Sequence, residues 1–223
     1  MLRGLYTSAA GMLGQLDRQD AIANNLANVN TAGYKRQVVA FSGFDTQLQS
    51  ALETTQNVML RNVTPLPKLY VDAKQGGLQD TGSKTNFALI GPGYFAVQNG
   101  TSQQLVRAGS FQLDGKGQIV NSDGNPVLGE KGPIQITGAD WSVDTEGNVA
   151  VGGSVVDKLK IVNGSTDAKK PTQVIQGRLE SSNVNAVEEM VSMITAFRSY
   201  EACQKSIQSL DQTLDKLINQ MGK

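Results

Sequence analysis

The chain has 223 residues, of which 39% are hydrophobic, and this is enough for one domain with a sizeable core plus some extended structure. Its 20 basic and 20 acidic residues leave no net charge, so the total charge gives no reason to expect a nucleic acid or an anionic membrane as partner. Histidine is absent and Cys203 is the only cysteine, which excludes Ser-His-Asp and Cys-His nucleophiles, almost every catalytic zinc site and any disulfide within the chain.

The N-terminal segment, residues 1–35, is predicted to be a long amphipathic helix followed by a stop at Gly33. Apolar or small residues recur at intervals of three or four, interrupted only by Gln19: Leu2, Leu5, Ala9, Met12, Leu16, Ala23 and Leu26. The segment lacks the apolar region and cleavage site of a secretory signal, and no run approaches the length of a membrane span. We therefore expect a protein that is cytoplasmic or is exported without a cleaved signal peptide, with no membrane insertion.

Four asparagines lie near the end of this helix, in "ANNLANVNTAGYKR": Asn24, Asn25, Asn28 and Asn30. Asparagine weakens a helix because its amide competes for nearby backbone groups. Asn24, Asn28 and Thr31 share one stripe of the helix, and Asn25 shares an adjacent stripe with Val29, so the amides form a face. One interpretation is a solvated, fraying helix end. The other is a face that sets the register of packing, with neighbouring subunits satisfying the amides.

The middle of the chain is predicted to be a linker followed by a small all-β domain. Over residues 36–75 the helical pattern is lost, and Pro65 and Pro67 favour an extended or turning chain. Residues 76–178 are dense in glycine, with short apolar runs such as "FALI", "YFAV", "GQIV", "IQIT" and "GNVAV" between the glycines. Such runs are typical of strands joined by tight turns.

Several short stretches of this region combine Gly with Asp, Asn or Pro, as some ligand-binding loops do. "DGKGQ", "NSDGN" and "DTEGN" carry Asp or Asn near Gly, but none fits a twelve-residue calcium loop, so we interpret them as hairpin turns. "GPGYF", residues 91–95, lacks a phosphate-binding fingerprint and is predicted to be a tight bend between strands. Nothing in the sequence brings two carboxylates together as acid and base. We expect no catalytic residue, no cofactor, no metal and no enzyme.

Residues 179–223 are predicted to form one long coiled-coil helix with Asn185 as its N-cap and Glu188 completing a capping box. Apolar residues follow a heptad pattern, with one interval shortened to six residues between Ile194 and Tyr200: Val187, Met190, Ile194, Phe197, Tyr200, Cys203, Ile207, Leu210, Leu214, Leu217 and Met221. A helix over residues 186–221 is about 54 Å long, which a small β-domain does not cover. The fold class is therefore expected to be α+β, with long terminal helices that form a coiled-coil assembly domain around a central all-β domain.

The expected subunit-interface residues lie on both terminal helices. They are Leu5, Met12, Leu16, Asn24, Asn25, Leu26, Asn28 and Asn30 on the first helix, and Met190, Ile194, Tyr200, Ile207, Leu210, Leu214 and Leu217 on the second. Each apolar stripe must contact the other helix of the chain or helices of other subunits, which favours assembly over catalysis. The alternative is an adaptor protein that forms a simple coiled-coil dimer and carries a β-domain.

The order of several motifs resembles that of the flagellar basal-body rod and hook protein family. The motifs are "LYTSAAGM", "IANNLANVNTAGYKR", "GGLQDTG", "FALIGPGYFAV", "RAGSFQLDGKGQIVNSDGNPVLG" and "LESSNVNAVEEMVSMITAFRSYEACQKSIQSLDQTLDKLIN". The resemblance implies a structural subunit of the rod, the drive shaft that crosses the periplasm, exported unfolded through the flagellar type III apparatus. It implies helical polymerisation with copies of itself and with other rod subunits above and below, the terminal helices forming an inner tube and the β-domain lying outside.

Within the family, "DRQDAIANN", "QKSIQSLDQTLDKLIN" and the modest length are most similar to subunits of the proximal part of the rod. The alternatives are a subunit of the distal part and a shortened hook-basal-body relative. The chain departs from the family pattern between residues 163 and 176, where it has a shorter segment than the family commonly has.

Overall fold

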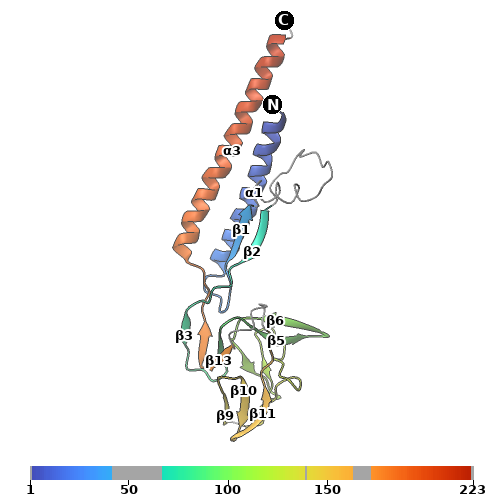
Figure 1. The fold of residues 1–223 in the computed structure, drawn as a ribbon, viewed down its shortest axis with the longest axis vertical. Coiled ribbons are helices and arrows are strands. Elements are labelled where there is room, and N and C mark those ends of the chain that lie inside the picture. The colour runs from blue at the N-terminus through green and yellow to red at the C-terminus, as the bar shows by residue number, and fades with distance from the viewer. Residues whose placement is uncertain (1, 42–66, 139, 163–171, 222–223) are drawn as a thin grey trace, which may run out of the picture. The chain divides into compact units, whose positions relative to one another are not determined.

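The computed structural model describes residues 2–41, 67–138, 140–162 and 172–221 (Figure 1). It divides the chain into two compact units. The helical unit comprises residues 1–27, 37–72 and 185–223, and the β-rich unit comprises residues 28–36 and 73–184. In the described residues, no helix is both long enough and apolar enough to cross a membrane.

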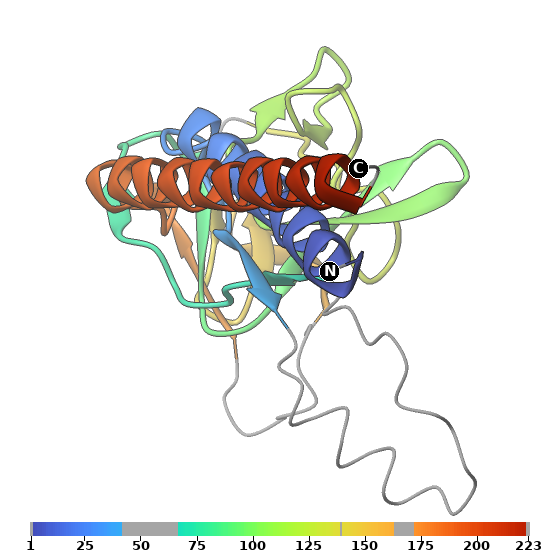
Figure 2. The same cartoon turned by 90° about the horizontal axis from the view of Figure 1, so that it is seen from above.

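The helical unit pairs the two ends of the chain. Helix α1 (Leu2–Ala27) and helix α3 (Ala186–Met221) lie side by side and run in opposite directions (Figures 1 and 2). Strands β1 (Gln37–Phe41) and β2 (Pro67–Val71) form an antiparallel pair, and β1 packs on α1. The interval that we expected to be an extended linker thus contributes two paired strands to this unit.

Of the two predicted helix boundaries, the start of α3 is confirmed and the end of α1 is wrong. The Asn185 side chain accepts a hydrogen bond from the backbone N–H of Val187 at 3.1 Å, which confirms it as the N-cap of α3. Helix α1 ends at Ala27, well before the predicted stop at Gly33. Gly33 serves another purpose: its φ is 69°, and a β-carbon there would lie 2.6 Å from the backbone nitrogen of Ala108. The glycine permits a close approach of two backbones, and turns between residues 28 and 34 end the helix.

The β-rich unit is built from small antiparallel sheets. Its strands are β3 (Leu78–Asp80), β4 (Phe87–Ile90), β5 (Tyr94–Asn99), β6 (Ser102–Val106), β7 (Gln112–Leu113), β8 (Ile119–Val120), β9 (Trp141–Val143), β10 (Asn148–Val151), β11 (Ser154–Lys158), β12 (Ile161–Val162), β13 (Gln173–Gln176) and β14 (Arg178–Glu180). The described strands pair in the orders β12-β5-β6, β11-β10-β9, β13-β4, β14-β3 and β7-β8.

The core of this unit is aromatic. Phe87 and Phe95 each lie within 6 Å of the ring of Phe111, and Trp141 meets Phe87 edge-on at 6.1 Å. Four of the five predicted apolar runs contribute strands: "FALI", "YFAV" and "GNVAV" fall on β4, β5 and β10, and the last two residues of "GQIV" form β8. "IQIT" forms only one isolated bridge, between Gln135 and Gln118, although its two isoleucines are buried. An α+β protein with terminal helices and a mostly β central region is therefore confirmed.

Candidate assembly surface

One face of α3 packs against α1. Buried and half-buried side chains recur along it at intervals of four and three: Glu189, Met193, Ala196, Tyr200, Cys203, Ile207 and Leu210. Ala196 is fully buried, and a β-carbon placed on Gly11 of α1 would lie 3.4 Å from Sγ of Cys203. Gly11 on α1 allows this close approach. We call this face the inner seam of α3.

The burial pattern along the inner seam shows that the register change predicted in this helix is wrong. Its heptad spacing continues without interruption past Ile194 and Tyr200. The predicted stripe had joined two different faces, because Ile194 is 56% exposed whereas Tyr200 lies on the half-buried inner seam. The apparent six-residue interval is the step from one face to the other.

A second apolar face of α3 points away from α1. It consists of Val187, Met190, Val191, Ile194 and Phe197, whose exposed fractions lie between 51% and 69%. Because successive residues of a helix are about 100° apart, Ile194 and the fully buried Ala196 point to nearly opposite sides. A shallow groove on this face also includes the guanidinium-bearing Arg198. We call this face the outer stripe of α3.

Helix α1 also has an exposed side. Leu13 and Leu16 are 64% and 41% exposed. Asp17 and Asp20 follow them by four residues each, so each aspartate lies on the same side of the helix as one of the leucines. The two aspartates line a hollow whose other wall includes Leu69 of β2, which is itself exposed.

Asn25 shows how one of the four asparagines is accommodated. Its side chain is fully buried, and its amide donates to the carbonyl of Gln37 and accepts from the N–H of Gln37, both at 2.8 Å. It also donates to Oε2 of Glu189 on the inner seam at 3.2 Å. The amide thus joins α1, β1 and α3 within one chain, whereas we expected neighbouring subunits to supply its partners. These bonds offset the low helix propensity of asparagine.

The remaining predicted interface residues occupy varied environments. Asn24 and Asn30 are exposed, and Asn28 accepts a hydrogen bond from the hydroxyl of Thr31 at 3.2 Å. Five of them are half-buried: Met12, Leu26, Tyr200, Ile207 and Leu210. Three are exposed: Leu16, Met190 and Ile194. The side chains of Leu5, Leu214 and Leu217 lie outside those that the structure describes.

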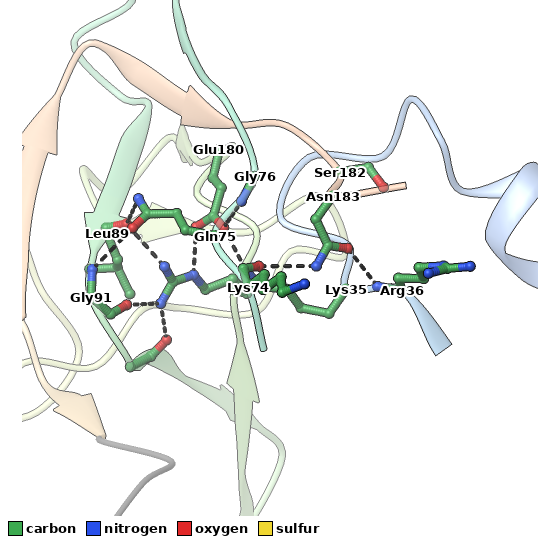
Figure 3. Close-up of polar contacts among 12 residues, drawn as sticks. Lys35, Arg36, Lys74, Gln75, Gly76, Leu89, Gly91, Glu180, Ser182 and Asn183 are labelled. Carbon is green, nitrogen blue, oxygen red and sulfur yellow. Dashed lines mark hydrogen bonds and ion pairs between the residues drawn. The ribbon is translucent and has the colours of Figure 1, made fainter. Parts of the chain in front are cut away.

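The β-rich unit contains a buried ionic network centred on Glu180 (Figure 3). One carboxylate oxygen of Glu180 accepts from Nζ of Lys35 at 2.6 Å and from the backbone N–H of Gly76 at 3.0 Å. The other oxygen accepts from Nε of Arg107 at 2.6 Å. All three charged side chains are at least nine-tenths buried. We call this set the Glu180 network.

The remaining donors of the network reach backbone carbonyls. Arg107 donates to the carbonyls of Leu89, Gly91 and Gly93 at 2.6–3.0 Å, which accounts for the tight bend predicted in "GPGYF". Nearby, Asn183 accepts from the N–H of Arg36 at 2.7 Å, as Figure 3 shows. Sequence reasoning missed this network, although the single charges in "RAGSF" and "LESSN" mark Arg107 and Glu180 within motifs that are otherwise uncharged.

The three Asp/Asn-Gly stretches form turns of one design. In each, the first side chain accepts from backbone N–H groups two and four residues later: Asp114, Asn121 and Asp144. Several hydrogen bonds hold the pKa of Asp144 below its usual value of 3.8, and the one from the side chain of Asn148 has the largest effect. The prediction that these stretches are turns is confirmed. Among the described residues, no group of three or more His, Cys, Asp or Glu side chains is placed to hold a metal ion.

Three protein families match successive parts of the chain. "Flagella basal body rod protein" matches residues 5–35, "Flagellar hook protein FlgE/F/G D1 domain" matches residues 88–151, and "Flagellar basal body rod FlgEFG protein C-terminal" matches residues 175–221. The second of these lies within the β-rich unit, and the other two include α1 and α3 for most of their length.

Full-length relatives show the same likeness. The flagellar basal-body rod protein FlgG of Buchnera aphidicola subsp. Schizaphis graminum is 32% identical over 264 residues, covering 97% of this chain and 99% of the relative. The flagellar basal-body rod protein FlgF of Rhizobium meliloti is 28% identical over 246 residues, covering 100% and 99%. The flagellar hook-basal body complex protein FlhO of Bacillus subtilis is 27% identical over 270 residues, covering all of both chains.

Proposed function

Because the chain belongs to the flagellar basal-body rod protein family and is a structural subunit of the basal-body rod, we propose that it polymerises helically through its terminal helices. The outer stripe of α3 is the observation that carries this proposal. A chain whose inner seam is already occupied by its own α1 still presents a second, uncovered apolar face. A simple coiled-coil dimer uses one seam per helix, so two faces on α3 favour a larger array over the adaptor alternative.

We further propose the proximal position in the rod. The alignment with the FlgF relative spans 246 residues against 264 for the FlgG relative, so this chain is closer in length to the FlgF type. The distal position is the second candidate, because identity is higher to the FlgG relative, at 32% against 28%. By the same family membership, the proposed partners are copies of this chain, rod subunits above and below it, and the type III export apparatus.

Ile194→Asp tests polymerisation. Ile194 is 56% exposed, so we expect the monomer to keep its melting temperature, because exposed substitutions usually change stability by less than about 0.5 kcal/mol. A carboxylate buried at each subunit contact costs several kcal/mol, so cells should lose motility and purified basal bodies should lack the protein. Ile194→Leu is the matched control and should retain both. Normal motility of the Ile194→Asp strain would contradict the proposal.

The position in the rod is tested by labelling. The turn at Gly152 and Gly153 joins β10 and β11, and a β-carbon at either glycine would meet no other atom within 4 Å, so it has room for an inserted tag. Electron microscopy of basal bodies that carry this tag should show extra density at the membrane-proximal end of the rod. Density next to the hook would establish the distal position instead.

A further inference from the structure

We infer that the outer stripe of α3 docks on the α1 side of a second copy of this chain, in the hollow next to Asp17 and Asp20, with Arg198 facing these aspartates. The inference rests on the proposed function and names the partner of the same surface. Both surfaces belong to the helical unit and both are exposed in the single chain.

The two surfaces match in apolar character. The outer stripe presents Val191 and Ile194 beside its groove, and the α1 side presents Leu13, Leu16 and, across the hollow, Leu69. Neither surface has an apolar partner within the described part of its own chain that covers it. Burying such side chains against each other stabilises association by about 25 cal/mol for each Å² of apolar surface removed from water.

The two surfaces also match in charge. Arg198 lies four residues after Ile194 and so on the same side of α3, while Asp17 and Asp20 lie four residues after Leu13 and Leu16 on α1. Each surface therefore presents an apolar side chain followed one turn later by a charge, and the charges are opposite. Glu201 and Lys205 are the next exposed charges of α3 toward its C-terminus, and their opposite signs leave Arg198 as the cation within the groove.

The pairing of two different surfaces determines the kind of assembly. When a patch contacts the same patch on a second copy, the contact closes into a dimer. When two different patches contact each other, each end of the assembly still has one unpaired patch to which another copy can bind. A copy that docks its α3 on a neighbour still offers its own α1 side to the next copy. Such contacts generate open helical polymers.

Cysteine cross-linking tests the pairing. In a Cys203→Ser background, Asp17→Cys and Arg198→Cys are placed together in the full chain, which is expressed in its own bacterium, and purified basal bodies are oxidised. We expect a ladder of dimers, trimers and larger species on a non-reducing gel, because every copy carries both halves of the contact. Asp17→Cys with Lys116→Cys, an exposed residue in a turn of the β-rich unit, is the control and should give no ladder.

Each outcome decides one question. A ladder from the Asp17/Arg198 pair alone supports the inference. Protein present in basal bodies without a ladder overturns the docking but leaves the rod function standing, and a product that stops at dimers overturns it in favour of a self-paired contact. Absence of the unsubstituted parent chain from basal bodies counts against the rod function itself. As an independent check, Arg198→Glu should abolish motility, and Asp17→Lys with Asp20→Lys should restore at least part of it.

Discussion

Replacing Glu180 with glutamine is expected to reduce the stability of the β-rich unit by about 3–5 kcal/mol, one of the two largest effects of a single substitution that we predict. Glutamine has nearly the same shape as glutamate but removes the negative charge that faces Lys35 and Arg107. Both cations are nine-tenths buried or more, so neither is hydrated in compensation. The loss is therefore dominated by two buried positive charges without a counter-ion.

The measurement uses Trp141, the only tryptophan, which is buried in the core of the same unit. Its fluorescence follows unfolding of this unit during denaturant titration of the full chain. Asp80→Asn is the matched control: Asp80 pairs with Arg178 at 3.8 Å, and both side chains are exposed. That change should cost less than about 1 kcal/mol. Equal effects of the two substitutions would show that burial does not govern the strength of the Glu180 network.

Gly109→Ala is expected to prevent the β-rich unit from folding cooperatively. A β-carbon at Gly109 would lie 1.6 Å from the carbonyl oxygen of Phe87, well inside any van der Waals contact. The two backbones cannot separate without cost, because the N–H of Phe87 donates to the carbonyl of Gly109 at 2.9 Å and Phe87 is fully buried in the core. We expect a loss of more than about 4 kcal/mol, which is a large share of the stability of a domain.

Gly77→Ala is the control for this glycine. A β-carbon at Gly77 meets no other atom within 4 Å, and the residue does not need a positive φ. The variant should therefore be as stable as the parent chain or slightly more stable, because alanine restricts the unfolded state. Near-ultraviolet circular dichroism, dominated by the aromatic core, should retain its signal in Gly77→Ala and lose it in Gly109→Ala. A folded Gly109→Ala variant would mean that the two backbones separate readily.

The parts of this fold that were predicted correctly are those specified by nearby residues. The N-cap at Asn185 depends on an amide and a backbone N–H two residues apart, and the turn at Asp144 depends on atoms within four residues. The long helices follow from periodicity within one segment. Such features can be predicted from sequence because both partners of each interaction lie in the same short window.

The parts that were missed depend on residues far apart in the chain. Glu180 is bonded to Lys35, 145 residues away, and Asn25 reaches Glu189 over 164 residues. Periodicity alone also cannot show which face of a helix is already covered. The inner seam of α3 includes the charged Glu189 and the small Ala196, so a search for large apolar residues passes over it and joins its lower half to the outer stripe. The predicted interface combines the two faces for this reason.

The way the chain enters and leaves the β-rich unit has a mechanical consequence. The entering segment is held by a bond from the N–H of Gly33 to the carbonyl of Glu180, and by one from the N–H of Arg36 to the side chain of Asn183. The leaving segment is the one that contains Glu180 and Asn183. Tension or torque applied between residues 36 and 184 is therefore carried by several hydrogen bonds and an ion pair side by side, rather than by one bond after another as when a hairpin is peeled open. Pulling these two segments apart requires these bonds to yield together, which stiffens this part of the β-rich unit without any covalent cross-link.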